Sequence, residues 1–347
     1  MKIDKYNPFN GDKALCHVDR WKLVKKGIVM SPVFVSLDLS EVCNLNCTFC
    51  NARKVRGKVK MDRATIDKAV GVLARWGTRA VCIGGGGEST LNPNIGYAIK
   101  RLHEHGVSVG IVTNGVKIPL INPEFVSWIG VSVDAATNKT YGKIKGCRPA
   151  TFDKVIENIK FFKKHYPSIE LTYKFLLHPL NEREVKDAIG LAKEIGCDRI
   201  HIRPGSYAWF DKTGKQFEFK VDSYRLTEED IDRGRLINES ENFRVHAVYE
   251  KFNRMFKPKI PFDRCYAGFA TCYISPRGGV GLCCDRRGDK KMMLGNLDNI
   301  EQRWGSQMHR NILKSVDVLM CPRCTYSHVN QIFENVIMED RMMVDFI

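Results

Sequence analysis

Short apolar, β-branched segments alternate with longer segments of helical periodicity over residues 33–202. The short segments predict six strands, at 33–39, 80–83, 107–112, 129–133, 169–177 and 199–202. Helices are predicted at 62–76, 93–105, 152–164 and 182–195, where apolar residues recur every three or four positions. Near-continuous apolar strands alternating with helices are typical of a parallel sheet covered by helices. The pattern therefore predicts an α/β fold, a partial (β/α)6 TIM barrel.

The less regular segments divide the rest of the chain. We expect an N-terminal arm at 1–30, the barrel core at 31–205, a connector at 206–262 with a helix near 228–238, a small cysteine-rich domain at 263–327 and a tail at 328–347. In such barrels, functional side chains lie at the carboxyl ends of the strands. The polar residues found there are Cys43, Glu88, Thr113, Asn114, Ser132, Asp134 and Arg203.

Composition narrows the class of protein. The chain has 347 residues, 44% of them hydrophobic, which is enough for a sizeable core. It shows no secretory signal and no apolar run long enough to span a membrane, so we expect a cytoplasmic protein. Thiols stay reduced in the cytosol, and the 13 cysteines therefore favour metal binding over disulfides.

The sequence Cys43-Asn-Leu-Asn-Cys47-Thr-Phe-Cys50 carries the strongest chemical signal. Three closely spaced thiolates can bind three irons of a cubane iron–sulfur cluster and leave the fourth iron open for chemistry. Zinc is the alternative, but it usually takes two C-x2-C pairs that lie further apart. Cys82 is expected to be a small core residue. Phe49 either packs beneath the loop or shields the cluster.

The formal net charge of +16 has two interpretations, a solvated basic surface or attraction of an anionic partner. Basic residues follow both cysteine sites, at 53–63 and at 286–291, which hints at a substrate with phosphate or carboxylate groups. These stretches lack interleaved aromatic residues, so a platform that stacks single-stranded nucleic acid is not indicated.

A run of four glycines and a glutamate, residues 84–88, follows the second predicted strand. Glycines let the backbone approach a ligand closely. The run matches no phosphate-binding loop, so an α-amino group held by Glu88 is the sharper alternative to a simple tight turn.

Together these motifs resemble the radical S-adenosylmethionine (SAM) superfamily. The resemblance rests on Cys43, Cys47 and Cys50 with Phe49, on Gly86-Gly87-Glu88 one β-unit later, and on Thr113-Asn114-Gly115. It implies a [4Fe–4S] cluster whose open iron binds SAM, with Phe49 against the adenine. It also implies a flavodoxin- or ferredoxin-type reductant. The implied SAM contacts are Gly86, Gly87 and Glu88 for the methionine amine, then Thr113, Asn114, Ser132 and Arg203.

A second cysteine group extends the resemblance. Its spacing is similar to the SPASM/twitch extension of radical SAM proteins, which holds an auxiliary [4Fe–4S] cluster. The implied ligands are Cys265, Cys283, Cys321 and Cys324, and a structural zinc at these thiolates is the alternative. Cys284 could replace Cys283 as a ligand or donate a hydrogen atom, while Cys272, Cys16, Cys147 and Cys197 are expected to be unligated.

The expected activity is hydrogen abstraction from a polar small molecule such as a sugar, aminocyclitol or nucleotide, followed by loss of a second electron to the auxiliary cluster. Alternatives are a radical SAM peptide maturase, a redox-neutral epimerase, and, in a different class, a cluster- or zinc-bearing nucleic-acid-binding protein. The general base stays open among Tyr173, His178 and His201.

Overall fold

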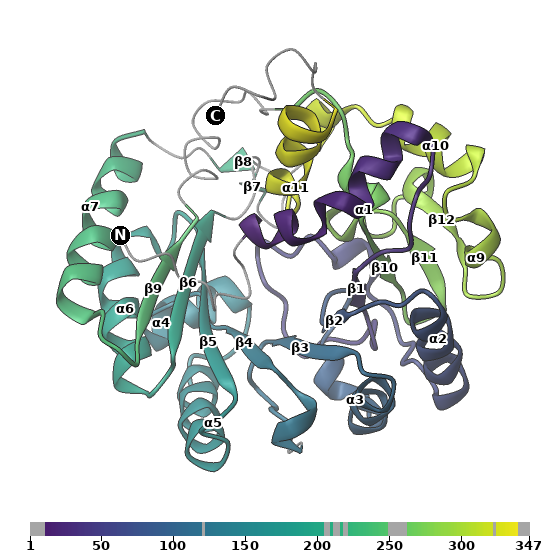
Figure 1. The fold of residues 1–347 in the computed structure, drawn as a ribbon. Coiled ribbons are helices and arrows are strands. Elements are labelled where there is room, and N and C mark those ends of the chain that lie inside the picture. Colours follow the sequence, from purple (N-terminus) through teal and green to yellow (C-terminus); the bar gives the residue numbers. More distant parts are fainter. Residues whose placement is uncertain are drawn as a thin grey trace.

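The computed structural model describes residues 11–119, 122–204, 209–210, 216–217, 221–248, 262–321 and 324–338. Its main feature is a curved sheet that contains eight parallel strands (Figure 1). Six of them follow the sequence prediction within a few residues: β1 (Phe34–Leu37), β2 (Ala80–Ile83), β3 (Ser108–Thr113), β4 (Trp128–Ser132), β5 (Glu170–Leu177) and β6 (Arg199–Pro204).

Two further parallel strands extend the predicted barrel at its edges. β9 (Arg244–Ala247) lies in the predicted connector and pairs with β6, and β10 (Thr271–Ile274) lies in the predicted C-terminal domain and pairs with β1. β11 (Gly279–Gly281) and β12 (Met293–Asn296) continue the sheet in antiparallel fashion. The strand order is β12-β11-β10-β1-β2-β3-β4-β5-β6-β9. The cysteine-rich segment therefore shares a sheet with the barrel. A separate two-stranded sheet pairs β7 (Trp209–Phe210) with β8 (Gln216–Phe217).

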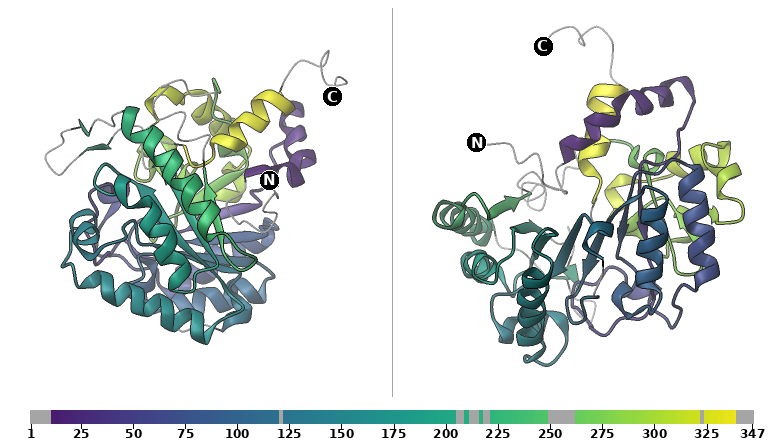
Figure 2. Two further views of the ribbon diagram at one scale, coloured as in Figure 1. Left: turned by 90° about the vertical axis from the view of Figure 1, so that its left-hand side faces the viewer. Right: turned by 60° about the horizontal axis from the view of Figure 1, so that its bottom comes forward.

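The two faces of the sheet differ in polarity. Helices cover the convex face, as Figure 2 shows, and the strand residues that point toward them form the buried core. Residues in register on the opposite, concave face include Ser36, Cys82 and Gly110 on neighbouring strands. Cys82, expected in the core, thus lies on the concave face, because a near-continuous apolar strand does not reveal which of its faces is outward.

The helices of the barrel are α2 (Arg63–Arg75), α3 (Ile95–Glu104), α4 (Asn138–Lys145), α5 (Thr151–His165), α6 (Val185–Glu194) and α7 (Val221–Asn238). All but α4 were expected from the sequence. α2 begins where its signal predicts: the Asp62 side chain accepts a hydrogen bond from the Thr65 amide at 2.8 Å and caps the helix. Its buried residues Ile66, Ala69, Val70 and Leu73 lie on one face.

The C-terminal segment also contains α9 (Ile300–Arg303), α10 (Gln307–Lys314) and α11 (Ser327–Ile332). Its contact with the barrel includes an exposed ion pair between Arg75 on α2 and Glu301 on α9, with Nη2 and Oε2 2.7 Å apart. His309 on α10 is fully buried, and its two ring nitrogens lie 3.0 Å from the Gly305 amide and from the Gly268 carbonyl.

The predicted arm and tail pack together. The arm contains α1 (Val18–Lys22) between two short 3-10 helices, and α11 is followed by a π-helical turn, Phe333–Ile337. Trp21 stacks on Phe333 with ring centroids 5.1 Å apart. Both views of Figure 2 place the arm beside the C-terminal helix. The described part of the predicted tail is therefore a helical element in contact with the arm, and residues 339–347 lie outside the described residues.

Candidate active site

The triad cysteines lie on the loop that follows β1, and the carboxyl end of α4 holds this loop. The amides of Asn46 and Thr48 donate to the carbonyl oxygens of Lys145 and Ile144 at 2.9 and 2.8 Å. The last carbonyl groups of a helix lack partners inside the helix. The triad loop supplies donors for two of them, so α4 fixes the backbone on both sides of Cys47.

Two arginines that follow the triad fold back onto the loop. Arg53 donates to the carbonyl oxygen of Cys47 at 2.7 Å, and Arg56 donates to the sulfur of Cys50 at 3.2 Å. The Arg56 guanidinium thus places a positive charge directly beside a predicted cluster ligand. The sequence hints that this basic stretch meets an anionic substrate, whereas these two side chains hold the triad loop.

A buried ion pair lies close to the triad. Lys145 donates to Asp134 Oδ2, and the two side chains are 1% and 2% exposed. Burial alone would lower the pKa of Lys145, but the Asp134 carboxylate outweighs it and the pKa is raised, so the ammonium persists. Burial raises the pKa of Cys47 to about 11, and the charge of Lys145 opposes that rise. Lys145 therefore keeps a positive charge near Cys47, and the Asp134 carboxylate opposes its effect.

The glycine stretch after β2 runs beside the residues that lead into Cys43. The Gly87 amide donates to the Ser40 carbonyl at 2.7 Å, and the Glu88 amide donates to the Val42 carbonyl at 2.8 Å. These two hydrogen bonds connect residues that lie 47 and 46 positions apart in the sequence, and they bring the glycine stretch and the triad loop together in one site.

The Glu88 carboxylate is the centre of a hydrogen-bond network. It accepts from the Thr113 hydroxyl at 2.8 Å, the Asn114 amide at 2.7 Å, and the Thr90 hydroxyl and amide at 2.8 and 3.1 Å. Burial raises the pKa of Glu88, and these hydrogen bonds oppose the rise. A carboxylate has about four acceptor positions. The Glu88 carboxylate thus joins the segments that follow β2 and β3, and its contact with a methionine amine stays a prediction.

The remaining predicted SAM contacts are spread around the same strand ends. Ser132 ends β4 on the concave face, and Arg203 lies near the end of β6. Phe49, on the triad loop, faces residues outside that loop: the Lys145 ammonium lies 5.3 Å from its ring centroid, and the His178 ring centroid lies 6.2 Å away.

The three candidate bases lie in different surroundings. Tyr173 is on the helix-facing side of β5 and its hydroxyl donates to a backbone carbonyl, so it does not reach the concave face. Burial lowers the pKa of His178 to about 4, which keeps its ring neutral. His201 lies on the concave face and stacks on His246 with ring centroids 5.1 Å apart. The geometry therefore excludes Tyr173 and leaves His178 and His201 as candidates.

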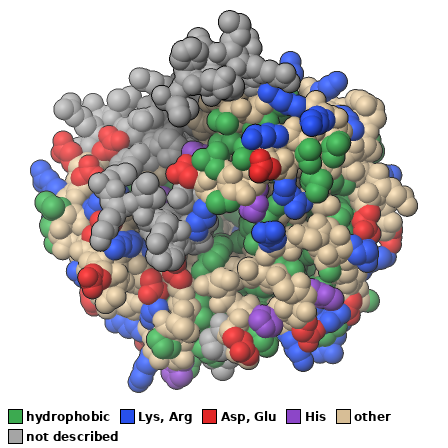
Figure 3. Space-filling model, in the orientation of Figure 1, with side chains coloured by type: hydrophobic (Ala, Val, Ile, Leu, Met, Phe, Trp, Pro, Cys, Tyr) green, Lys and Arg blue, Asp and Glu red, His purple; other side chains and the backbone are tan. Residues whose placement is uncertain are grey.

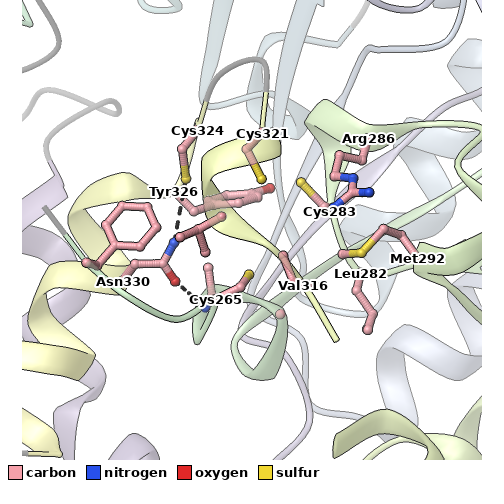
Figure 4. A pocket seen from close by; sticks show the side chains of 14 residues that line it. Cys265, Leu282, Cys283, Arg286, Met292, Val316, Cys321, Cys324, Tyr326 and Asn330 are labelled. Carbon is pink, nitrogen blue, oxygen red and sulfur yellow. Dashed lines mark hydrogen bonds between the residues drawn. The ribbon is translucent and has the colours of Figure 1, made fainter. Parts of the chain in front are cut away.

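The second cysteine group lines a pocket. Figure 4 shows the labelled thiols pointing toward one another, with Cys321 and Cys324 on one segment and Cys265 and Cys283 on two others. Cys283 lines this pocket whereas Cys284 does not. Cys272, on β10, is buried in the core and does not line the pocket. The thiols in the pocket are the four that the sequence groups, Cys265, Cys283, Cys321 and Cys324.

Hydrogen-bond donors surround these sulfurs. The backbone of residues 267 and 268 opposes the rise that burial causes in the pKa of Cys265. The Asn330 side chain donates to the Cys324 sulfur at 3.6 Å, and its oxygen accepts from the Tyr266 and Ala267 amides at 2.8 and 2.7 Å. Hydrogen bonds to sulfur are one of the factors that set the potential of an iron–sulfur cluster.

The chemistry of this pocket fits a cluster. Burial raises the pKa of Cys265 to about 11 and also raises the pKa values of Cys283 and Cys321, so metal binding would release protons. The Arg286 charge opposes the rise at Cys321. Within the described ranges, no three His, Cys, Asp or Glu side chains converge on one metal-ion position.

Comparisons with known proteins agree with this geometry. Residues 37–192 match the Radical SAM superfamily. Residues 37–192 therefore form a radical SAM domain. The chain thus binds SAM and a [4Fe–4S] cluster, and its parallel sheet is the partial TIM barrel of radical SAM enzymes.

Relatives of this radical SAM protein are distant. The molybdenum cofactor biosynthesis protein moc-5 of Caenorhabditis elegans is 28% identical over 175 residues, 48% of this chain and 28% of that protein. A probable GTP 3′,8-cyclase of Pyrococcus abyssi is 26% identical over 166 residues, 46% of this chain and 53% of the cyclase. The matches thus span about half or less of these relatives.

Solved structures share the fold over most of the chain. Streptococcus suis SuiB bound to the precursor peptide SuiA superposes with a TM-score of 0.65 at 18% identity, covering 85% of this chain and 70% of SuiB. The protein anSMEcpe with bound AdoMet and a peptide gives 0.59 at 19% identity, covering 81% and 83%. Among the described helices, none has the length and apolar character to cross a membrane.

Proposed function

We propose that this radical SAM enzyme oxidises an anionic small molecule by two electrons and that an auxiliary [4Fe–4S] cluster accepts the second electron. The observation that carries the proposal is the pocket lined by four thiols. The cysteine-rich segment that forms this pocket shares one sheet with the radical SAM domain, because its strand β10 pairs with β1. The bound SAM and its cluster supply a radical that removes hydrogen from an unactivated carbon. The residues of this chain then have to hold, orient and shield the reactants.

We assign the SAM-binding cluster to Cys43, Cys47 and Cys50, with Phe49 as the shield of this loop. The network around Glu88 supports the assignment, because it fixes the adjacent strand ends in one arrangement. The other proposed SAM contacts are Gly86, Gly87, Glu88, Thr113, Asn114, Ser132 and Arg203.

The concave face supports an anionic substrate. The interior of a parallel barrel is usually filled with branched apolar side chains. On this face, the described strands β5, β6 and β9 carry several cationic or imidazole groups and one acid, Glu170, which pairs with Arg199 at 3.0 Å. These groups share a face because they are in register along three neighbouring strands: Lys174, Arg199, His201, Arg203, Arg244 and His246.

Close packing directs Lys174 along this face. A Cβ atom at Gly130, on the neighbouring strand, would lie 2.8 Å from Lys174 Cδ. The missing side chain of Gly130 therefore leaves room for the stem of Lys174. Strand-end SAM contacts and the Lys174 side chain occupy the same concave face, so a substrate anion held there lies near the predicted radical.

The auxiliary site supplies the second half of the oxidation. A substrate that has lost a hydrogen atom still has to lose one electron and one proton to become, for example, a ketone. A cluster bound by Cys265, Cys283, Cys321 and Cys324 has all four irons ligated by protein, which suits electron transfer. We propose a flavodoxin- or ferredoxin-type protein as reductant of the triad cluster, and His201 as the candidate that receives the proton.

Three alternatives give different outcomes in the same experiments. SuiB and anSMEcpe were both solved with peptides, so a peptide substrate is the nearest alternative. An epimerase would return a hydrogen atom from Cys284, which is buried with its carbonyl bonded to Arg287. A nucleic-acid-binding protein would need a basic patch. On the face drawn in Figure 3, basic and acidic side chains are interspersed.

Anaerobic reconstitution tests the proposal. We expect about eight irons per chain, since each cubane holds four, and reductant-dependent release of 5′-deoxyadenosine. Cys43→Ala should abolish that release. The double variant Cys321→Ala/Cys324→Ala should keep it with about four irons but yield no oxidised product. One bound zinc and no SAM cleavage would falsify the proposal.

The substrate class is tested separately. Candidate sugar phosphates, nucleotides and their dephosphorylated forms are compared for hydrogen transfer from labelled substrate into 5′-deoxyadenosine. Lys174→Gln should weaken use of the anionic forms about tenfold or more while SAM cleavage without substrate continues, whereas the exposed control Lys100→Gln should change neither. Transfer only from peptides would establish a peptide maturase. Cys284→Ala abolishing an epimerised product would establish an epimerase.

A further inference from the structure

Loops from the two cysteine sites meet at a buried ion pair. Arg287 follows the Cys283-Cys284 pair, and Asp38 follows β1 and precedes the triad loop. Arg287 donates from Nε to Asp38 Oδ2 at 2.6 Å and from Nη2 to Oδ1 at 3.0 Å. The two side chains are 8% and 2% exposed. Such bidentate pairs hold both partners in one orientation.

Each partner also holds one of the loops. Asp38 Oδ2 accepts a hydrogen bond from the Gly86 amide at 3.0 Å, so the carboxylate fixes the glycine stretch. Arg287 Nη1 donates to the carbonyl of Cys284, so the guanidinium fixes the turn next to Cys283. A continuous series of hydrogen bonds therefore runs from the auxiliary pocket to the SAM-binding glycines.

The glycine stretch is packed tightly around this pair. Gly85 has φ +94°, in the region that favours glycine, and a Cβ atom there would lie 2.0 Å from Asp38 Oδ1 and 2.3 Å from Arg287 Nη2. Neither side chain can move far without changing its contact with the glycine backbone. The position of the ion pair and that of the glycine stretch are therefore mutually dependent.

The same turn is tied to the other end of the auxiliary pocket. Asp285 accepts hydrogen bonds from the Thr325 amide and hydroxyl, the latter at 2.9 Å. Thr325 directly follows Cys324, and Asp285 lies between Cys283 and Arg287 in the chain. Anything that fixes the four thiols relative to one another also fixes the turn that carries Arg287.

We propose that Arg287 and Asp38 are positioning residues that couple cluster occupancy of the auxiliary site to SAM binding. The inference rests on the proposed function, because it requires both clusters. A cluster in the pocket holds the 283–287 turn, which holds Asp38 through Arg287 and presents the Gly86 stretch in one arrangement. Without that cluster the turn loosens, and SAM binds to a less ordered glycine stretch at the cost of ordering it. Thermodynamic coupling is reciprocal, so bound SAM also favours an intact auxiliary site.

A two-by-two comparison tests the coupling. Four proteins are reconstituted: the wild type, Cys321→Ala/Cys324→Ala without the auxiliary site, Arg287→Lys, and the triple variant. The SAM dissociation constant is measured by anaerobic equilibrium dialysis, and SAM contact with the triad cluster by the EPR spectrum of its reduced form. Loss of the auxiliary site should weaken SAM binding about tenfold with Arg287 present, within the 5–150-fold typical of coupled sites. In the Arg287→Lys background the same loss should change the constant less than about twofold.

Two controls separate coupling from general damage. Arg75→Lys alters an exposed pair, with Glu301, that also joins the barrel to the C-terminal segment, and it should leave the coupling intact. Asp38→Asn keeps an acceptor for the Gly86 amide but loses the charge, so it should reduce the coupling. It replaces Arg287→Lys in the comparison if that variant fails to fold.

The outcomes distinguish this proposal from the proposed function. The coupling alone is refuted if the wild type retains about eight irons and Cys321→Ala/Cys324→Ala, which lacks the auxiliary site, binds SAM equally well. Equal weakening with Arg287 and with Arg287→Lys refutes the role of this pair. A wild type that never exceeds about four irons refutes the auxiliary cluster itself.

Discussion

Removal of the buried charge next to the triad should cost more stability than removal of the whole ion pair. Lys145→Met leaves Asp134 as an uncompensated charge in a site where both side chains are 1–2% exposed. Breaking such a pair from one side typically costs about 3–5 kcal/mol. Asp134 cannot easily turn to water, because its Oδ1 accepts from the Leu176 amide at 2.6 Å and its carbonyl accepts from the Asn181 side chain at 2.8 Å.

The double variant Asp134→Asn/Lys145→Met removes both charges. Asn keeps the acceptor for Leu176 and tolerates the positive φ of 62° at this position, so the double variant should lose only about 1–2 kcal/mol, the scale of one impaired hydrogen bond. The coupling between the two substitutions should therefore exceed about 2 kcal/mol. Lys145 still offers its backbone carbonyl to Asn46 in every variant, so the triad loop keeps this anchor.

Urea unfolding of the metal-free protein under reducing conditions measures these differences. Lys68→Met is the matched control, since Lys68 pairs with Asp298 at the surface and should cost less than about 1 kcal/mol. A cost below about 1 kcal/mol for Lys145→Met, or additive single variants, would show that Asp134 is not buried with its charge. In the reconstituted protein, loss of the cation near Cys47 should also lower the reduction potential of the triad cluster, as read by spectroelectrochemistry.

Three further outcomes are expected. Burial lowers the pKa of His309 to about 4, so the stability that its neutral ring provides is complete above pH 6.5 and is lost as the pH falls toward 4, by up to about 3 kcal/mol; His309→Gln should flatten that slope in urea midpoints measured across pH. Gly85→Ala should abolish SAM binding in dialysis or prevent folding, because its Cβ would lie 2.0 Å from Asp38 Oδ1; wild-type binding would contradict the packing. Phe333→Ala should cost about 3–5 kcal/mol by removing the fully buried ring that stacks on Trp21, and unchanged melting of the metal-free protein would show that the C-terminal helix is dispensable.

The sequence predicts the strands of this fold better than their environment. Strands that are apolar at almost every position stand out, and six were located within a few residues. β9 and β10 have only four residues each, and they lie in segments where strands and helices do not alternate regularly. The sequence pattern therefore did not indicate them. α4 was missed because its sequence, NKTYGKIK, is mostly polar. Lys145 at its end is buried only because Asp134 compensates the charge of this side chain.

The candidate site divides along the same line. The triad, Glu88 and Thr113-Asn114 were predicted as one site because each follows a strand, and parallel strands end at one edge of the sheet. The Glu88 hydrogen bonds to Thr113 and Asn114 agree with that reasoning. Asp38 and Arg287 could not be paired from sequence, because 249 residues separate them and neither belongs to a motif. The sequence signal that was available is Asp38 itself, a polar residue directly after a strand, which marks it as a candidate site residue.

The position of β1 explains why the two cysteine sites belong to one structural unit. Its carboxyl end leads through Asp38 into the triad loop, and its edge pairs with β10 over all four residues of both strands. β10 leads through β11 into Cys283. The relative position of the sites is therefore set by strand register and by the Asp38–Arg287 pair, whereas a flexible linker between two domains would leave it free. A division of the chain at residue 263 would expose the edge of β1 and leave Asp38 buried without its cation, so the barrel and the cysteine-rich segment fold as partners of one sheet.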